Sequence, residues 1–381
     1  MNKNIGLLLL GIAISRVAYF MTTPFLTFYL VNLGNISPVE IGVIVSSQAI
    51  FHLLSLLIVP KISNHLPLKT WLILIAFGSG ISNMLLANSQ MFVSLFILNG
   101  LNGFWLACYE PQVKLALSLL SEEQMRLKIF NLRYTLINFG AVIGPLLNNY
   151  FQLNDLNSHL ILSFAYFIVG LLNCSLVIIE DDNQLNSKQS REENKSISLK
   201  KQFILLIVAV TFSYFAYSQL QSTIPQFLIY QGKQGLAIYR KLLSTSGLLI
   251  IFLQFPIMKI TKKYSMKQKL IVSNLNLAIC LLFAPYLTKM WGMLLFLGSY
   301  VLGEILLGSN YDYAVDKLAD DTTKSSAFIF GEIVKIGSVV GPILGNSIFS
   351  FIGWQAAPWL FAIFAGITLI GSLLLKLMKD F

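Results

Sequence analysis

Seven charged residues lie inside long apolar stretches, and these side chains have the types that could do chemistry. They are Arg16, Glu110, Arg133, Glu304, Asp312, Glu332 and Lys335. A charge inside a membrane-spanning helix costs roughly 3 kcal/mol or more, so each one requires a reason. Desolvation favours the neutral form of a carboxylate and a nearby cation favours its charged form, so a change of surroundings can drive proton exchange. The alternative is a static ion pair that holds helices together.

The positions of these residues within their stretches predict partners. Glu110 and Arg133 lie at similar depths from the ends of successive apolar stretches, so they could pair, whereas Arg16 and Glu304 each lie near the middle of a stretch. Glu332 and Lys335 are three residues apart and share one helical face. Asp312, near the end of its stretch, is either a gate or a solvated terminus. We expect at least one of Glu110, Glu304 and Glu332 to exchange a proton.

The composition identifies the elements that must position these charges. The chain has 381 residues, of which 56% are hydrophobic and 12% charged, and its mean hydropathy is +0.71. A soluble domain is about one quarter charged, so the sequence predicts an integral membrane protein and excludes a large water-soluble domain. A spanning helix needs about 20 apolar residues, which gives room for about twelve spans. The net charge of +10 is expected to set membrane topology, without nucleic acid as a partner.

Apolar runs between polar breaks predict twelve transmembrane helices in two sets of six. The first set covers 5–31, 39–60, 70–88, 91–117, 129–149 and 159–179, and the second covers 203–230, 237–258, 268–287, 291–315, 326–349 and 355–377. Between the sets lies the one sustained polar stretch. We therefore expect an N-terminal bundle at 1–180, a cytoplasmic linker at 181–202 that cannot form a packed core, and a C-terminal bundle at 203–381.

Basic residues predict the orientation in the membrane. With the N-terminus inside, the inner segments hold 20 lysines and arginines, the outer segments hold four, and three fall within spans. Cytoplasmic loops carry the excess of Lys and Arg in membrane proteins. We expect both termini in the cytoplasm.

The two sets of helices repeat each other in sequence. The run G-A-V-I-G-P-L-L at 140–147 returns as G-S-V-V-G-P-I-L at 337–344. Tyr109-Glu110 returns as Tyr311-Asp312, and Pro24 of the first helix has a counterpart in Pro225 of the seventh. Matches in the same order at similar offsets indicate a duplicated six-helix unit.

These features resemble the major facilitator superfamily over the whole chain. The loop at 60–69, P-K-I-S-N-H-L-P-L-K, resembles the family's gating motif, with Asn64 and His65 where the family has an acidic and a basic residue. The fifth span resembles the antiporter motif of drug:proton exporters, which implies close packing at Gly140, Gly144 and Pro145 and at Gly337, Gly341 and Pro342. The resemblance places spans 1, 4, 5, 10 and 11, which carry the seven charges, around a central cavity.

The resemblance implies a proton-coupled secondary active exporter of small molecules in the cell membrane, a multidrug or metabolite efflux protein that works as a monomer by alternating access. The alternative is a dedicated exporter of a carboxylate-rich metabolite, such as an opine-type metallophore or a siderophore, because Arg16, Arg133 and Lys335 would suit carboxylates. No phosphate-binding loop, metal-ligand spacing or nucleophile signature is present in the sequence, so we expect no enzyme activity, no cofactor and no metal site. Asn99 and Asn102 are further polar residues within spans, with either substrate contact or helix bridging as their role. His52, deep in the second span, is either a satisfied core histidine or a proton relay.

Overall fold

A computed structural model describes residues 3–63, 66–151, 155–177, 201–232, 234–318, 327 and 330–379. All its regular elements are helices, and no strand occurs among the described residues. The chain contacts divide it into two units, Met1–Glu180 and Asp181–Phe381. Most of the predicted linker lies outside the described residues.

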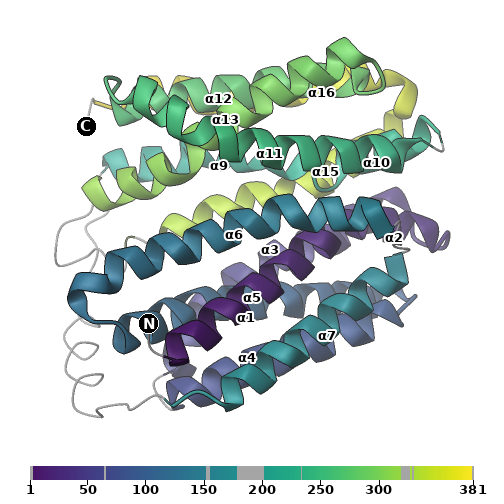
Figure 1. The fold of residues 1–381 in the computed structure, drawn as a ribbon. Coiled ribbons are helices and arrows are strands. Elements are labelled where there is room, and N and C mark those ends of the chain that lie inside the picture. Colours follow the sequence, from purple (N-terminus) through teal and green to yellow (C-terminus); the bar gives the residue numbers. More distant parts are fainter. Residues whose placement is uncertain are drawn as a thin grey trace. The chain divides into compact units, whose positions relative to one another are not determined.

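The N-terminal unit is a bundle of long helices (Figure 1). Its elements are α1 (Lys3–Thr22), η1 (Thr23–Phe25), α2 (Leu26–Asn32), α3 (Pro38–Ser63), α4 (Leu68–Ala87), α5 (Phe92–Leu120), α6 (Glu123–Phe151) and α7 (Asp155–Cys174). The first predicted span comprises α1, η1 and α2. Pro24 lies in η1, where its missing N–H interrupts the α-helical hydrogen bonds.

The C-terminal unit is built in the same way. Its elements are α9 (Lys201–Gln219), α10 (Thr223–Tyr230), α11 (Gly235–Thr261), α12 (Met266–Phe283), η2 (Ala284–Tyr286), α13 (Met290–Leu318), η3 (Glu332–Lys335), α15 (Ile336–Ile352), η4 (Trp354–Ala356) and α16 (Ala357–Lys376). The seventh predicted span is also broken, because α9 ends at Gln219 and α10 begins at Thr223, with three residues between them. Pro225 lies in the first turn of α10, where a proline is tolerated.

The same helix pairs contact each other in both units. In the N-terminal unit α1 packs on α6 and α7, α3 on α5, and α4 on α5 and α7. In the C-terminal unit the corresponding pairs are α9 with α15 and α16, α11 with α13, and α12 with α13 and α16. The duplication predicted from sequence is therefore also a duplication of packing.

Eleven helices in the described part of the chain are long and apolar enough to cross a membrane. The helix α6 has 29 residues but is not among them, since Asn138, Asn148 and Asn149 lower its hydropathy. Large apolar side chains such as Phe252, Phe351 and Trp359 are 71–90% exposed, which is typical of a surface that faces lipid. The all-helical membrane fold with two repeated units is confirmed.

The helix boundaries differ from prediction most at α6 and α7. The helix α6 begins at Glu123, where the predicted span begins at 129, and α7 ends at Cys174, where the predicted span ends at 179. The predicted start of the eleventh span, residue 326, lies outside the described residues, and residues 327, 330 and 331 are helical ahead of the 3-10 turn Glu332–Lys335.

Candidate functional site

Three of the predicted charges form one cluster in the N-terminal unit. Arg16 of α1 donates through Nη2 to Oε1 of Glu110 on α5. Arg133 of α6 lies against Oε2 of the same carboxylate. The pairing of Glu110 with Arg133 that their depths predict is present, and Arg16 joins it. One carboxylate is therefore shared by two guanidinium groups from two other helices.

The cluster of Arg16, Glu110 and Arg133 carries one excess positive charge. The two arginines are buried, at 7% and 8% exposure, whereas the Glu110 side chain is 31% exposed. The Nε atoms of both arginines are buried without a hydrogen-bond partner in the described part of the chain. Arg16 also lies near the rings of Tyr19 and Tyr109, with 5.9 and 5.6 Å between its Cζ and the ring centroids. The cluster thus holds positive charge that its one carboxylate does not balance, and two buried N–H groups that no described residue accepts.

Glu304 has different surroundings in the C-terminal unit. It lies partly buried on α13, one helical turn from Tyr300, whose hydroxyl interacts electrostatically with its carboxylate. The ring of Tyr300 stacks on Tyr217 of α9, with 6.2 Å between centroids and an interplanar angle of 26°. Among the described residues no Lys or Arg forms an ion pair with Glu304, in contrast to Glu110.

The remaining predicted charges lie nearer to solvent. Lys335 Nζ is 2.6 Å from Glu332 Oε2, and the two side chains are 26% and 42% exposed. The local pairing predicted from their spacing is therefore present. Asp312 is exposed on α13. The loop residues Asn64 and His65 lie outside the described residues, so no geometry can be given for the gating motif.

The glycine motif lies where two helices of one unit touch. A Cβ atom placed on Gly140 would come within 2.8 Å of the Arg16 backbone, and one on Gly144 within 2.6 Å of the Met21 nitrogen. In the other unit Gly337 and Gly341 meet the backbone of α9 at Thr211 and Phe215 in the same way. Pro145 and Pro342 each lie within their helices. The motif brings α6 against the segment of α1 that carries Arg16.

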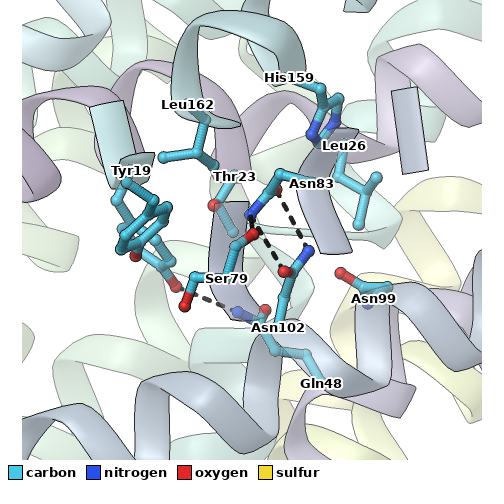
Figure 2. A pocket seen from close by; sticks show the side chains of 11 residues that line it. Tyr19, Thr23, Leu26, Gln48, Ser79, Asn83, Asn99, Asn102, His159 and Leu162 are labelled. Carbon is cyan, nitrogen blue, oxygen red and sulfur yellow. Dashed lines mark hydrogen bonds between the residues drawn. The ribbon is translucent and has the colours of Figure 1, made fainter. Parts of the chain in front are cut away.

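A small polar cavity lies within the N-terminal unit, away from Glu110 and Arg133. Figure 2 shows the side chains around it. Its lining residues are Tyr19, Thr23, Leu26, Gln48, Ser79, Asn83, Asn99, Asn102, His159, Leu162 and Tyr166. Asn99 and Asn102 were candidates from sequence, but Asn83 and His159 were not, because they lie in spans without embedded charges. His52, a histidine that the sequence did single out, does not line this cavity.

The chain matches the family described as "Major Facilitator Superfamily" over residues 8–332. It is 27% identical over 373 residues to the "Uncharacterized MFS-type transporter YqjV" of Bacillus subtilis (strain 168), covering 96% of this chain and 90% of that protein. It is 21% identical over 407 residues to a "Na(+), Li(+), K(+)/H(+) antiporter" of Planococcus maritimus, covering 97% and 94%.

Solved structures share the fold at low sequence identity. The nucleoside transporter NupG has a TM-score of 0.81 at 14% identity, covering 98% of both chains. A peptide transporter POT mutant in complex with sulfate has a TM-score of 0.80 at 14% identity, covering 99% of this chain and 94% of that one. At such identities the likeness shows the fold and nothing about the substrate.

Proposed function

The chain belongs to the major facilitator superfamily, and on this premise we propose that it is a proton-coupled secondary active exporter of small molecules that works by alternating access. That it is a multi-pass membrane transporter, and not an enzyme, follows from the family and from its relatives. The proposal adds the coupling ion, the direction and the substrate class. The antiporter relative supports proton exchange, and the close packing at Gly140 and Gly144 supports the exporter motif.

The observation that carries proton coupling is the difference between Glu304 and Glu110. Two guanidinium groups neutralise the Glu110 carboxylate. The Glu304 carboxylate has a tyrosine hydroxyl as its partner and no cation in the described part of the chain. A partly buried carboxylate without a counter-charge is most simply neutralised by a proton, which it can release when water reaches it. We therefore assign proton exchange to Glu304.

Proton movement in proteoliposomes with an imposed pH gradient tests this assignment. The protein is reconstituted with a pH dye inside the vesicles, and ethidium, citrate or the chlorides of Na⁺, Li⁺ and K⁺ are added in separate runs. Glu304→Gln should abolish substrate-induced proton movement. The exposed Glu122→Gln is the matched control and should behave as the wild-type protein. A Glu304→Gln variant that transports and responds to pH like wild type contradicts the assignment.

A second candidate function is the export of a carboxylate-rich metabolite, such as an opine-type metallophore or a siderophore. The excess positive charge of Arg16, Glu110 and Arg133 favours it, as do the two unpaired Nε donors. Guanidinium groups bind carboxylates through paired hydrogen bonds. In the same vesicles, a response to citrate that is lost in Arg133→Gln, with no response to ethidium, would support this candidate. A response to ethidium alone would support multidrug efflux.

We further propose that the protein is a monomer in the cytoplasmic membrane with both termini in the cytoplasm, and that residues 181–202 form a cytoplasmic linker between bundles at 1–180 and 203–381. The distribution of Lys and Arg supports this orientation. Single cysteines introduced at Lys3 and Lys379 should react with an impermeant maleimide in inverted vesicles and stay unlabelled in intact cells. Labelling of these cysteines in intact cells would show that the termini lie outside the cell and would contradict the proposed orientation.

A further inference from the structure

Five long helices of the N-terminal unit and the broken segment of the first span contribute side chains to the wall of the polar cavity. Tyr19, Thr23 and Leu26 come from α1, η1 and α2, and the rest from α3, α4, α5 and α7. Nine of its eleven lining residues carry a polar group on the side chain, and none of them is Asp, Glu, Lys or Arg. The cavity is therefore polar but without a formal charge in its wall.

The hydrogen bonds of the cavity wall leave acceptor oxygens available. Asn83 and Asn102 donate to each other's side-chain oxygens at 3.0 and 3.2 Å, as Figure 2 shows. Asn99 uses its Nδ2 on the Ile44 carbonyl at 2.7 Å, which leaves its oxygen toward the cavity. Gln48 donates to the Tyr19 hydroxyl at 3.3 Å. Empty cavities in proteins are apolar, whereas a polar cavity with room for about one molecule holds water.

His159 adds a titratable group to this wall. Its side chain is 4% exposed, and its Nδ1 has no hydrogen-bond partner among the described residues. Leaving a buried polar atom unpaired costs free energy, and a water molecule in the cavity can remove this cost. The imidazole ring of His159 also lies beside the ring of Tyr29, with 5.4 Å between centroids and an interplanar angle of 60°.

We propose that this cavity is a water site at which His159 binds a proton, separate from Glu304 and Glu110. Hydronium in the cavity transfers its proton to an imidazole nitrogen, which leaves water and an imidazolium. The titratable groups around His159 are Tyr29 of α2, Tyr19 of α1 and Tyr166 of α7, and the lining residues of α3, α4 and α5 carry only amides and a hydroxyl. The ring of Tyr29, with its centroid 5.4 Å from that of His159, is the aromatic group beside the cation.

The position of the cavity connects this proton to the charge cluster. Tyr19 lines the cavity, and its ring centroid lies 5.9 Å from Cζ of Arg16, which pairs with Glu110. A proton on His159 therefore adds a positive charge that repels the excess positive charge of the cluster of Arg16, Glu110 and Arg133. A role of this proton in transport rests on the proposed function, whereas the water site and the protonation of His159 do not.

Nitrogen NMR of the histidines tests the proposal directly. The chain has three histidines, His52, His65 and His159, so ¹⁵N-histidine labelling of the protein in nanodiscs gives a spectrum that can be assigned with His52→Gln and His159→Gln. On acidification the His159 nitrogens should change from the neutral to the imidazolium pattern. A neutral pattern throughout the acidic range overturns the proposal.

A variant in which two polar residues of the cavity wall are replaced by apolar ones tests whether water in the cavity is needed for the protonation of His159. In Asn83→Leu/Asn102→Leu both members of the amide pair become apolar at similar volume, a replacement that can be nearly neutral for stability. The titration of His159 should be lost in this variant and kept in His52→Gln. If the double variant titrates like the wild type, water in this cavity is not the proton source and the proposal fails.

Hydroxyl-radical footprinting of the wild-type protein covers the case in which the double variant does not fold. Radicals formed from bound water oxidise side chains that touch it, even when they are buried. Tyr166 and Tyr311 are 8% and 6% exposed, but only Tyr166 lines the cavity. Strong oxidation of Tyr166 with protection of Tyr311 supports the water site, and equal protection overturns it. Neither measurement requires transport, so failure of the proposed function would be seen separately with Glu304→Gln.

Discussion

Asn148 and Asn346 each donate a hydrogen bond to the broken first helix of their own unit, although the alignment of the two glycine motifs places Asn346 opposite Asn149. Asn148 Nδ2 donates to the Met21 carbonyl at 2.8 Å, one residue before α1 ends. Asn346 Nδ2 donates to Ser222 Oγ at 2.7 Å, in the break between α9 and α10. Each break frees backbone groups that a membrane cannot hydrate. Asn148 therefore supplies a donor to a backbone carbonyl beside the first break, and Asn346 bonds a side-chain hydroxyl within the second break.

Replacing Asn148 by leucine should destabilise the protein by about 1–3 kcal/mol, because the Met21 carbonyl would be left buried without a partner. Asn346→Leu should have a similar effect through Ser222. Thermal unfolding in detergent measures both. Asn276→Leu is the control, since this half-buried asparagine bonds a carbonyl of its own helix and its loss should change stability little. Equal effects at Asn276 and Asn148 would show that the break is not stabilised in this way.

Gly144→Ala should lower the stability by about 1–3 kcal/mol, since the added Cβ would lie 2.6 Å from the Met21 nitrogen and would push α6 away from α1. Gly298→Ala on α13 is the matched control, because a Cβ there meets no atom within 4 Å. The melting temperature of Gly298→Ala should equal or exceed that of the wild type. Similar losses in the two variants would contradict the close contact at Gly144.

Glu110→Gln should destabilise the protein by about 3–5 kcal/mol, because two buried guanidinium groups would lose their shared carboxylate. Adding Arg133→Gln should recover part of this loss, since one of the two unpaired charges is removed. The coupling free energy from the double-mutant cycle is the measurement. Purely additive effects would mean that Glu110 and Arg133 do not interact in the membrane.

Lys335→Gln should change the free energy of unfolding by no more than about 1 kcal/mol. Its pair with Glu332 is short, at 2.6 Å, but the two side chains are 26% and 42% exposed, and solvent screens such a pair. Comparison with Glu110→Gln by thermal unfolding distinguishes a buried cluster from a solvated pair. A loss as large as that of Glu110→Gln would place Lys335 in a drier environment than its exposure indicates.

Residue types and their local order were sufficient to predict the class of fold. Hydropathy adds up over each window of about 20 residues without regard to distant contacts, so the membrane helices, the duplication around Gly140 and Gly337, and the embedded charges could be read from the sequence. Exact helix ends were less predictable, since α6 begins six residues before and α7 ends five residues before the positions that hydropathy predicts, 129 and 179.

The tertiary structure decided which of these side chains meet. Depth along a helix follows from residue number, so the pairing of Glu110 with Arg133 could be predicted. The direction in which a side chain points depends on how helices are rotated against each other, so the second partner, Arg16, could not be predicted from depth alone. For the same reason His159 and Asn83, which no charge pattern marks, enter the cavity only when α4 and α7 are packed against α1 and α5.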